Sequence, residues 1–175
     1  DDNFETVIFR PATVCGYSPR MRFDLSVNIL TCHAICNNKI NVFGGDQLRP
    51  NLHIQDYSEC VQLLINEDKN KIQKQIFNVG FQNLSIINIA KLVKKELETS
   101  FNFKNIEIIR TESNDNRSYH INSDKIYNTL GFKPKFSIEN AVHEITNCFE
   151  KNLFKNPLEN SIYHNVKTLK QNNVK

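Results

Sequence analysis

Short apolar runs that end at glycine or proline, with helical patterns between them, constrain the fold of this chain more than any other feature. Four runs have the length of a strand: residues 5–9, 40–43, 76–79 and 106–109. Pro11 follows the first run and Gly80 follows the third, and both residue types interrupt a regular strand. The intervals carry apolar residues at helical spacing. Strands that alternate with helices, without an internal repeat, predict an α/β fold with some parallel strand pairing.

Five intervals carry helical patterns, and most of them have a start or stop signal. These are residues 23–36, 56–66, 86–98, 124–130 and 138–149. Ser85, Ser123 and Ser137 each precede a helical pattern, where a hydroxyl accepts a hydrogen bond from a free backbone N–H. Gly131, followed by Pro134, predicts a helix that ends in the left-handed conformation. The strands are too few for a complete doubly wound sheet.

Size and charge fit one globular domain with a basic end. The chain has 175 residues, of which 39% are hydrophobic and 23% charged, and such a chain can bury a core. The net charge is +3, but residues 151–175 hold five Lys and one Glu, a local charge of +4. We therefore expect residues 151–175 to form a flexible, solvated tail. A nucleic-acid-binding domain would place its basic residues on a folded face, so we expect no nucleic-acid partner.

Membrane insertion, secretion and disulfide bonds are not expected from the sequence. No apolar stretch approaches the roughly 20 residues of a membrane helix, and no basic and apolar leader with a cleavage site is found. The five Cys form an odd set without the spacing of a disulfide framework. Reduced thiols point to a cytoplasmic protein. The chain opens with Asp1 and enters a strand-like run almost at once, which we interpret as the cut edge of a longer sequence.

Two sets of reactive side chains suggest sites but lack parts that those sites need. Cys32, His33 and Cys36 lie about one helical turn apart, yet no further ligand follows at a spacing suited to zinc. We expect these thiols to be buried in the core. Ser, His and Asp are all present, but no G-x-S-x-G nucleophile elbow occurs. We therefore predict neither a metal site nor a serine hydrolase.

Four motifs follow one another along residues 7–149. They read FRPATVCG at 9–16, GGDQLRPNLHIQD at 44–56, FNVG at 77–80, and DNRSY at 115–119 followed by DKI at 124–126 and LGFKP at 130–134. In this order and spacing they resemble the C-terminal portion of extended short-chain dehydrogenase/reductases, in particular the NAD-dependent nucleotide-sugar 4-epimerases and 4,6-dehydratases. Cys15 stands where that family usually has Tyr, and Asn116 stands where it often has Pro.

The resemblance implies a division of the chain and an enzyme class. Residues 1–150 would be the C-terminal part of a Rossmann-type extended short-chain dehydrogenase/reductase fold, with residues 4–16 and 76–80 as strands of the cofactor sheet. The remainder would mostly form the small α/β subdomain that binds substrate. The parent enzyme, expected to be a homodimer, would transiently oxidise a sugar hydroxyl through bound NAD. It would then complete an epimerisation or a dehydration, as an isomerase or a lyase.

The same resemblance places the chemistry upstream of the first strand. In the family, the glycine-rich dinucleotide loop, the catalytic Ser or Thr and the Tyr-x-x-x-Lys pair all precede that strand. No catalytic residue is therefore assigned in this chain. NAD or NADP is expected to be held mostly by the upstream half, and we expect the chain alone to be inactive.

Cofactor and base contacts are implied for segments at strand ends, where α/β proteins bind ligands. The turn formed by Pro11, Ala12, Thr13 and Val14 would hold the nicotinamide carboxamide through its backbone. Phe43, at the end of the second predicted strand, would pack against the nucleotide base. Core packing is the alternative for Phe43, because Val42 and Phe43 point to opposite faces of a strand and one of them faces inward.

Five polar residues are implied as ligands of a nucleotide-diphosphate sugar. Arg49 and Arg117 would hold the diphosphate, because guanidinium groups bind phosphate oxygens bidentately. The alternative for each is a surface or structural arginine. Asn28 would contact the diphosphate from within the first helix. Arg20 and Arg22, in the loop before that helix, would line the sugar or the diphosphate.

Two residues with catalytic side chains receive structural predictions instead. Asp56 is predicted to cap the helix that follows it, with Glu59 three residues on completing a capping box. In the family, too, this Asp orients a buried helix. His53 is predicted to be a buried strand histidine and not a base.

One alternative function stays open at this level. A non-catalytic relative could bind a dinucleotide or a sugar as a module, or pair with a separate chain that carries the Rossmann half. The DNA just upstream separates these alternatives. An in-frame glycine loop and Tyr-x-x-x-Lys would favour an enzyme, and an immediate start codon would favour the module.

Overall fold

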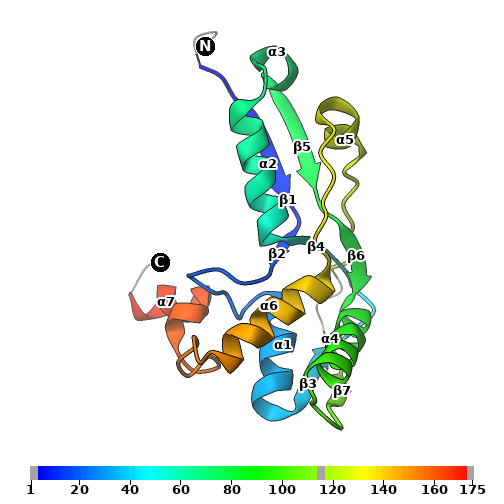
Figure 1. The fold of residues 1–175 in the computed structure, drawn as a ribbon, viewed down its shortest axis with the longest axis vertical. Helices are drawn as coiled ribbons and strands as arrows, with labels where there is room; N and C mark the ends of the chain where they lie inside the picture. Colours follow the sequence, from blue (N-terminus) through cyan, green and yellow to red (C-terminus); the bar gives the residue numbers. More distant parts are fainter. Residues whose placement is uncertain (1–3, 114–116, 173–175) are drawn as a thin grey trace.

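The computed structural model describes residues 4–113 and 117–172 as an elongated molecule whose two ends meet in a narrow middle (Figure 1). At one end, strands β1 (Val7–Pro11) and β5 (Gln75–Val79) pair in parallel. Helices α2 (Ile54–Asn66) and α5 (Asp124–Leu130) lie beside this pair, and the short α3 (Lys69–Ile72) precedes β5. Apolar side chains from these strands and helices form one buried cluster.

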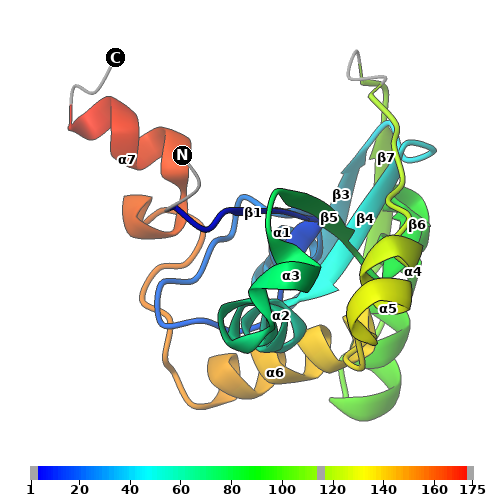
Figure 2. The ribbon, with the colours of Figure 1, turned by 90° about the horizontal axis from the view of Figure 1, so that it is seen from above.

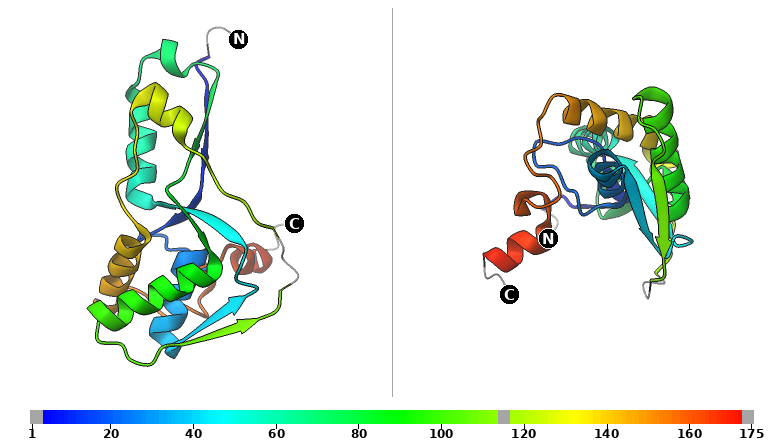
Figure 3. Two further views of the ribbon diagram at one scale, coloured as in Figure 1. Left: turned by 90° about the vertical axis from the view of Figure 1, so that its right-hand side faces the viewer. Right: turned by 90° about the horizontal axis from the view of Figure 1, so that it is seen from below.

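The other end is a group of helices packed beside a second parallel pair. Helices α1 (Ser26–Asn37), α4 (Ile86–Ser100) and α6 (Ile138–Glu150) pack on one another, and β3 (Lys39–Phe43) pairs in parallel with β7 (Glu107–Thr111). The left view of Figure 3 shows the helices gathered to one side of these strands. The largest buried apolar cluster lies here, with contributions from all three helices and β3.

A small three-stranded sheet joins the two ends. Its order is β2 (Thr13–Cys15), β4 (Leu48–His53) and β6 (Gln82–Ser85), with β4 parallel to β2 and antiparallel to β6. β2 follows β1 after one residue, and β6 follows β5 after two. Both strands of the first pair therefore run directly into the joining sheet, so the loops at their carboxyl ends lie where the two ends of the molecule meet.

The predicted fold class is confirmed, since strands and helices alternate and three strand pairs are parallel. The four predicted strands and five predicted helices all occur, with ends within three residues of those expected. The strands β2, β4 and β6 were not predicted. They are three to six residues long, and β4 carries Pro50 and the buried Asn51, so they lack the apolar alternation of a strand.

Most of the predicted helix signals are confirmed, with one change of role. Ser85 caps α4, and Ser137 caps α6 in a capping box completed by Asn140. Gly131 ends α5 with a φ of 68°, the left-handed conformation. Ser123 precedes α5, but its hydroxyl bridges the backbone of Gly80 instead, accepting from the N–H at 2.8 Å and donating to the carbonyl at 2.9 Å.

The predicted capping role of Asp56 is wrong, although Asp56 is structural. Helix α2 begins at Ile54, and its N-cap is His53, whose Nδ1 accepts from the backbone N–H of Gln55 at 3.2 Å. Asp56 lies within the first turn and is fully buried. Its carboxylate accepts from the backbone N–H groups of Lys135 at 2.9 Å and Phe136 at 3.0 Å. It therefore ties α2 to the segment that leads into α6.

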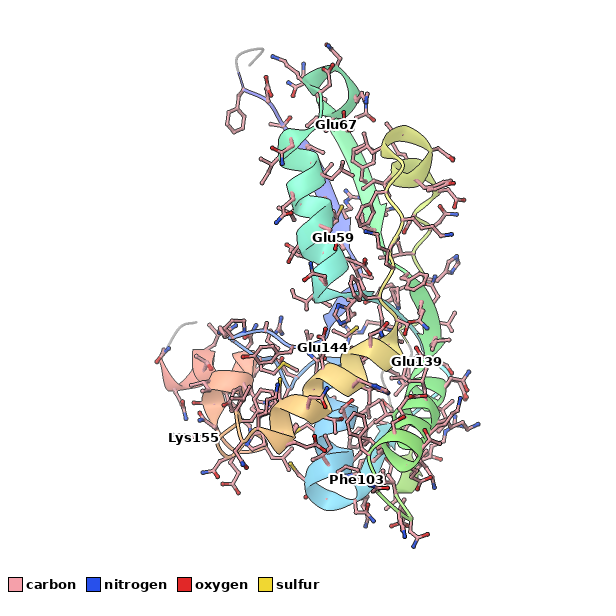
Figure 4. The ribbon with its side chains drawn as sticks, in the orientation of Figure 1. Glu59, Glu67, Phe103, Glu139, Glu144 and Lys155 are labelled. Atoms are coloured by element: carbon pink, nitrogen blue, oxygen red, sulfur yellow. The ribbon has the colours of Figure 1, made fainter. Side chains whose placement is uncertain are left out.

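The predicted capping box at α2 also fails, because Glu59 binds a different partner. Its carboxylate lies 3.0 Å from the ammonium group of Lys135 and also accepts from the side-chain amide of Gln55 at 3.4 Å. Figure 4 shows Glu59 on α2.

The described part of the C-terminal segment, residues 151–172, carries two short helices, and its flexibility stays a prediction. The 3-10 helix η1 (Ser161–Tyr163) and helix α7 (Asn165–Gln171) follow α6. Tyr163 is 7% exposed, and its ring lies edge-on to Phe23 with centroids 5.4 Å apart. Phe154 lies edge-on to the same ring of Phe23 at 5.1 Å. The expectation for this segment was based on its Lys residues. In the structure, aromatic residues that are far apart in the sequence pack the segment against the rest of the molecule.

We expect Tyr163→Ala to lower the free energy of unfolding by about 3 kcal/mol, because it leaves a cavity in a buried aromatic cluster. Denaturant unfolding of the 175-residue chain measures the change. Leu153→Ala is the control, since Leu153 is 50% exposed and its loss should cost less than about 0.5 kcal/mol. Equal effects of the two substitutions would show that the segment does not pack as described.

Candidate functional site

A cavity of about 450 Å³ opens where β1 ends, at the junction between the two ends of the molecule. This volume lies within the range of small-molecule sites. Its lining comes from the turn after β1, the loop before α1, α1 itself and the first turns of α2. The lining residues are Pro11, Ala12, Thr13, Val14, Gly16, Ser18, Arg20, Arg22, Leu25, Asn28, Ile54 and Tyr57. Seven of the residues singled out from the sequence are therefore brought together in one cavity.

The turn from Pro11 to Val14 is held tightly against β5. The backbone N–H of Ala12 donates to the carbonyl of Val79 at 2.7 Å, and Ala12 is 5% exposed. A Cβ at Gly80 would lie 3.1 Å from the Cβ of Ala12, so glycine allows β5 to end this close to the turn. The turn is thus a fixed wall of the cavity.

The two arginines of the loop before α1 are held by neighbouring groups. Arg22 makes a bidentate pair with Asp24, at 3.0 and 3.1 Å. Arg20 donates to the side-chain oxygen of Asn165 at 2.8 Å. Partial burial raises the pKa of the Asp24 carboxyl, but the hydrogen bonds from Arg22 and from the Asn165 N–H outweigh it and hold the pKa below its ordinary value. Asp24 is therefore charged at neutral pH and fixes Arg22.

Asn28 lines the cavity, but both polar atoms of its side-chain amide form hydrogen bonds with the surrounding backbone. Its Oδ1 accepts from the N–H of Gly16 at 3.2 Å, and its Nδ2 donates to the carbonyl of Arg22 at 3.0 Å. Asn28 is 3% exposed. These contacts show a structural role, in which Asn28 fixes the two ends of the loop that carries Arg20. A direct contact with diphosphate stays a prediction.

A second cavity, of about 390 Å³, gathers Arg49, Arg117, Ser118 and Tyr119. Arg49 lies on β4 and donates to the carbonyls of Leu48 and Arg117. Its guanidinium carbon lies 5.6 Å from the centre of the Tyr119 ring, a cation–π arrangement. Arg49 and Arg117 are 68 residues apart in the sequence, and the structure brings them together as predicted.

Phe43 lies at the end of β3 and is 62% exposed, whereas Val42 beside it is fully buried. Val42 therefore fills the core position, and the alternative of core packing does not apply to Phe43. Phe43 is not among the residues that line either cavity. Its contact with a nucleotide base stays a prediction.

The motifs that build these cavities match a known family. A family model described as GDP-mannose 4,6 dehydratase matches residues 8–145.

The chain belongs to this family. This membership confirms the resemblance to the extended short-chain dehydrogenase/reductase family that the motifs carry. A dTDP-glucose 4,6-dehydratase of Shigella flexneri is 21% identical over 144 residues, which are 78% of this chain and 39% of that protein. The chain thus spans about two fifths of the length of this curated relative.

Solved structures show that the fold is shared. The UDP-glucuronic acid 4-epimerase from Bacillus cereus, in complex with UDP-glucuronic acid and NAD, gives a TM-score of 0.70 at 23% identity. That likeness covers 87% of this chain and 48% of the epimerase. A UDP-glucose 4-epimerase from Thermotoga maritima, solved with UDP-glucose, gives a TM-score of 0.67 at 21% identity. That likeness covers 86% of this chain and 48% of the Thermotoga maritima enzyme.

The catalytic pair of the family has one sequence counterpart here, and its position does not suit catalysis. Tyr163 and Lys167 have the Tyr-x-x-x-Lys spacing but lie at the end of the chain and not before the first strand. The Tyr163 hydroxyl accepts from the backbone N–H of Lys155 at 3.3 Å within the aromatic cluster. Lys167 donates to the carbonyl of Leu158 at 3.0 Å. Neither residue lines the cavity at the end of β1.

The thiols and histidines do not form a metal site within the described residues. Burial raises the pKa of the Cys15 thiol to about 12 and also raises that of Cys32. Both thiols are therefore neutral at physiological pH, as core cysteines are. Cys36, in contrast, is exposed, so the expectation of burial fails for that residue. Within residues 4–113 and 117–172, no helix is long and apolar enough to cross a membrane.

A contact between His53 and Glu144 supports one side of the cavity and was not predicted. His53 is 1% exposed, as expected, and stacks on Phe136 with ring centroids 5.1 Å apart. Its Nδ1 accepts from Gln55, which places the ring hydrogen on Nε2, 3.2 Å from Oε2 of Glu144. The angle is outside that of a regular hydrogen bond, so the contact is chiefly electrostatic. Figure 4 shows Glu144 on the side of α6 that faces the start of α2.

Glu144 also reaches the loop that enters the cavity. The same Oε2 accepts from the backbone N–H of Tyr17 at 3.3 Å. A Cβ at Gly16 would lie 2.8 Å from Nε2 of His53, and Gly16 has a φ of 99°, so only glycine fits this turn. Partial burial raises the pKa of the Glu144 carboxyl, but His53 and the Tyr17 N–H outweigh it and keep the pKa below its ordinary value. The carboxylate therefore fixes the start of the loop that precedes α1.

We expect Glu144→Gln to lower the free energy of unfolding at pH 7 by about 0.5 to 1 kcal/mol, because solvent screens a carboxylate that is 42% exposed. Folding lowers the pKa of Glu144, so its contribution is complete above the ordinary value of 4.5 and is lost as the pH falls through the lowered value. Denaturant unfolding of both proteins between pH 7 and pH 3 measures the difference. A difference that stays constant over this range would contradict the role of the charge.

Proposed function

We propose that this chain forms the part of an NAD(P)-dependent nucleotide-sugar epimerase or dehydratase that faces the sugar nucleotide. The observation that carries the proposal is the gathering of four arginines at two cavities of ligand size. Arg20 and Arg22 line the cavity at the end of β1, and Arg49 and Arg117 line the second. Membership of the family supports the same class of substrate, and two solved relatives hold UDP-glucuronic acid or UDP-glucose.

The second cavity suits a diphosphate. Its two guanidinium groups come from a strand and from a separate loop, so they can approach an anion from different sides. Arginine binds phosphate oxygens through paired hydrogen bonds and is weakly hydrated, which lowers the cost of leaving water. The Tyr119 ring under Arg49 holds the guanidinium plane in place. In this proposal Arg49 and Arg117 bind the diphosphate and Phe43 packs against the base.

The cavity at the end of β1 suits the sugar and the reactive end of the cofactor. Pro11, Ala12 and Val14 give it small and apolar surface, and Ile54 and Tyr57 add to this. Such a lining can pack against the face of a ring, and the rigid backbone of the turn offers polar groups beside it. NAD(P), when bound, supplies the hydride transfer of the family's reaction. The residues of this chain orient the sugar and keep it in place.

The proposal assigns binding to this chain and leaves the proton-transfer groups elsewhere. The Tyr-x-x-x-Lys spacing occurs only at Tyr163 and Lys167, both engaged in the packing of the C-terminal segment. Binding by this chain alone is expected to be weak, because the chain spans about two fifths of the dehydratase relative, and the motif resemblance implies that most of the cofactor site lies upstream of the first strand.

We expect Arg49→Ala and Arg117→Ala each to weaken the binding of UDP-glucuronic acid by about 10-fold, because each removes one charged hydrogen-bonding group from the diphosphate. Isothermal titration of the purified chain at fixed salt measures this. Lys95→Ala is the control, because it removes one positive charge from the exposed face of α4, outside both cavities. Equal weakening by all three variants would indicate nonspecific charge attraction instead.

We also expect the 175-residue chain, given NAD and either UDP-glucose or dTDP-glucose, to convert neither nucleotide sugar. The expectation follows because, among the described residues, no Tyr–Lys pair lines the cavity at the end of β1. Product analysis by chromatography, with a complete family enzyme as positive control, measures conversion. Turnover by the purified chain would contradict the division of roles proposed here.

A further inference from the structure

The C-terminal segment lies beyond the family match and contacts the loop that carries the cavity arginines. The match ends at residue 145, whereas η1 and α7 cover residues 161–171. Figure 1 shows α7 beside the loop that runs from β2 to α1, and Figure 2 shows α7 on the side of the molecule away from α4. A cavity of about 320 Å³ lies between them and is lined by Pro19, Arg20, Ile162, Tyr163 and Thr168. Arg20 therefore borders both this space and the cavity at the end of β1.

Asn165, the first residue of α7, is linked to both arginines of the loop. It contacts Arg20 directly, and it contacts Asp24, which in turn holds Arg22. Its side-chain Oδ1 accepts from the guanidinium of Arg20 at 2.8 Å. Its backbone N–H donates to Oδ2 of Asp24 at 3.0 Å. The same carboxylate holds Arg22 bidentately. One residue of the C-terminal segment thus fixes the two cationic groups that line the cavity.

The position of Asn165 is fixed by the packing around it. Two residues earlier, Tyr163 is buried in the aromatic cluster, and its carbonyl accepts from the backbone N–H of Phe23 at 2.9 Å. Phe23 is fully buried, and it stands between Arg22 and Asp24 in the sequence. The loop and the segment are therefore joined at three successive points, through Arg20, Phe23 and Asp24.

We propose that Asn165 is a positioning residue for the substrate cavity, and that the segment of η1 and α7 tunes which sugar nucleotide the cavity accepts. Without the Asn165 oxygen, the Arg20 guanidinium is released toward the neighbouring space that it also borders. Without the Asn165 N–H, Asp24 loses one of the groups that hold its carboxylate on Arg22. The effect on binding rests on the proposed function, whereas the effect on the loop does not.

Three substitutions of Asn165 separate its two contacts. Asn165→Ala removes the acceptor for Arg20 and keeps the N–H. Asn165→Pro removes both, and proline is well tolerated at the first position of a helix, so α7 is expected to remain. Asn165→Asp keeps an oxygen of the same size for Arg20 and serves as the conservative rescue. Gln171→Ala, at the far end of α7, is the matched control.

The first measurement is hydrogen exchange of the backbone amides of residues 17–25, in the 175-residue chain without any nucleotide. We expect exchange of this loop to be fastest in Asn165→Pro, intermediate in Asn165→Ala, and unchanged in Asn165→Asp and Gln171→Ala. Thermal unfolding of each variant shows whether the whole fold has changed. Unchanged exchange of residues 17–25 in the folded Pro variant would overturn the positioning role.

The second measurement is the affinity for UDP-glucuronic acid and UDP-glucose. We expect Asn165→Ala to weaken the binding of UDP-glucuronic acid by about threefold to tenfold, as for one hydrogen bond, and to change its affinity ratio to UDP-glucose. Asn165→Asp should restore both values. If the unsubstituted chain binds neither probe while the loop loosens as expected, the proposed function fails and the positioning role stands. Equal losses for both probes, not restored by Asp, would overturn the tuning of specificity.

Discussion

The buried carboxylate of Asp56 is the contact on which the arrangement of the whole molecule depends. It lies in the first turn of α2, at one end, and accepts two backbone hydrogen bonds from the segment that leads into α6, at the other. A fully buried carboxylate is costly unless its oxygens are satisfied, and here both are. The same segment places Phe136 on the His53 ring, and His53 faces Glu144 of α6. One buried acid thus fixes how the two ends meet.

The cavity at the end of β1 follows from that junction. The turn from Pro11 to Val14 comes from one end, and the loop before α1 comes from the other. Each is fastened by groups that are themselves buried or paired, namely Gly80 against the turn, and Asn28 and Glu144 against the loop. A cavity whose walls are fixed in advance loses little entropy on binding, which favours affinity and selectivity. The arginines are held by Asp24 and Asn165 in the same way.

The sequence was sufficient for the elements with strong periodicity and for the motif residues. The strands β1, β3, β5 and β7 and the helices α1, α2, α4, α5 and α6 were predicted from apolar spacing and cap signals. The meeting of Arg49 with Arg117 was predicted from the motifs alone. Each of these predictions depends on a local pattern or on residue types in a fixed order. Both kinds of signal can be read from one sequence without an alignment.

The remaining features depend on contacts between distant residues that carry no local signal. The residues around Asp56 predicted a helix cap and not its hydrogen bonds to Lys135 and Phe136. No pattern near Asp56 in the sequence indicates those distant partners. The His53–Glu144 contact joins residues from a strand end and a helix that no motif links. The charge of residues 151–175 concealed the aromatic anchor at Tyr163, since four aromatic rings from separate segments form that cluster only after folding.

The most direct test of the central claim is an NMR titration of the isotopically labelled 175-residue chain with UDP-glucuronic acid. The account predicts that the perturbed backbone and arginine side-chain signals gather at residues 11–14, 20–22, 49 and 117. Signals of α3 should stay in place, because α3 lies at the end of the first strand pair away from the cavity. Perturbations confined to the lysines of α7, or spread evenly over the molecule, would contradict a nucleotide-sugar site at these cavities.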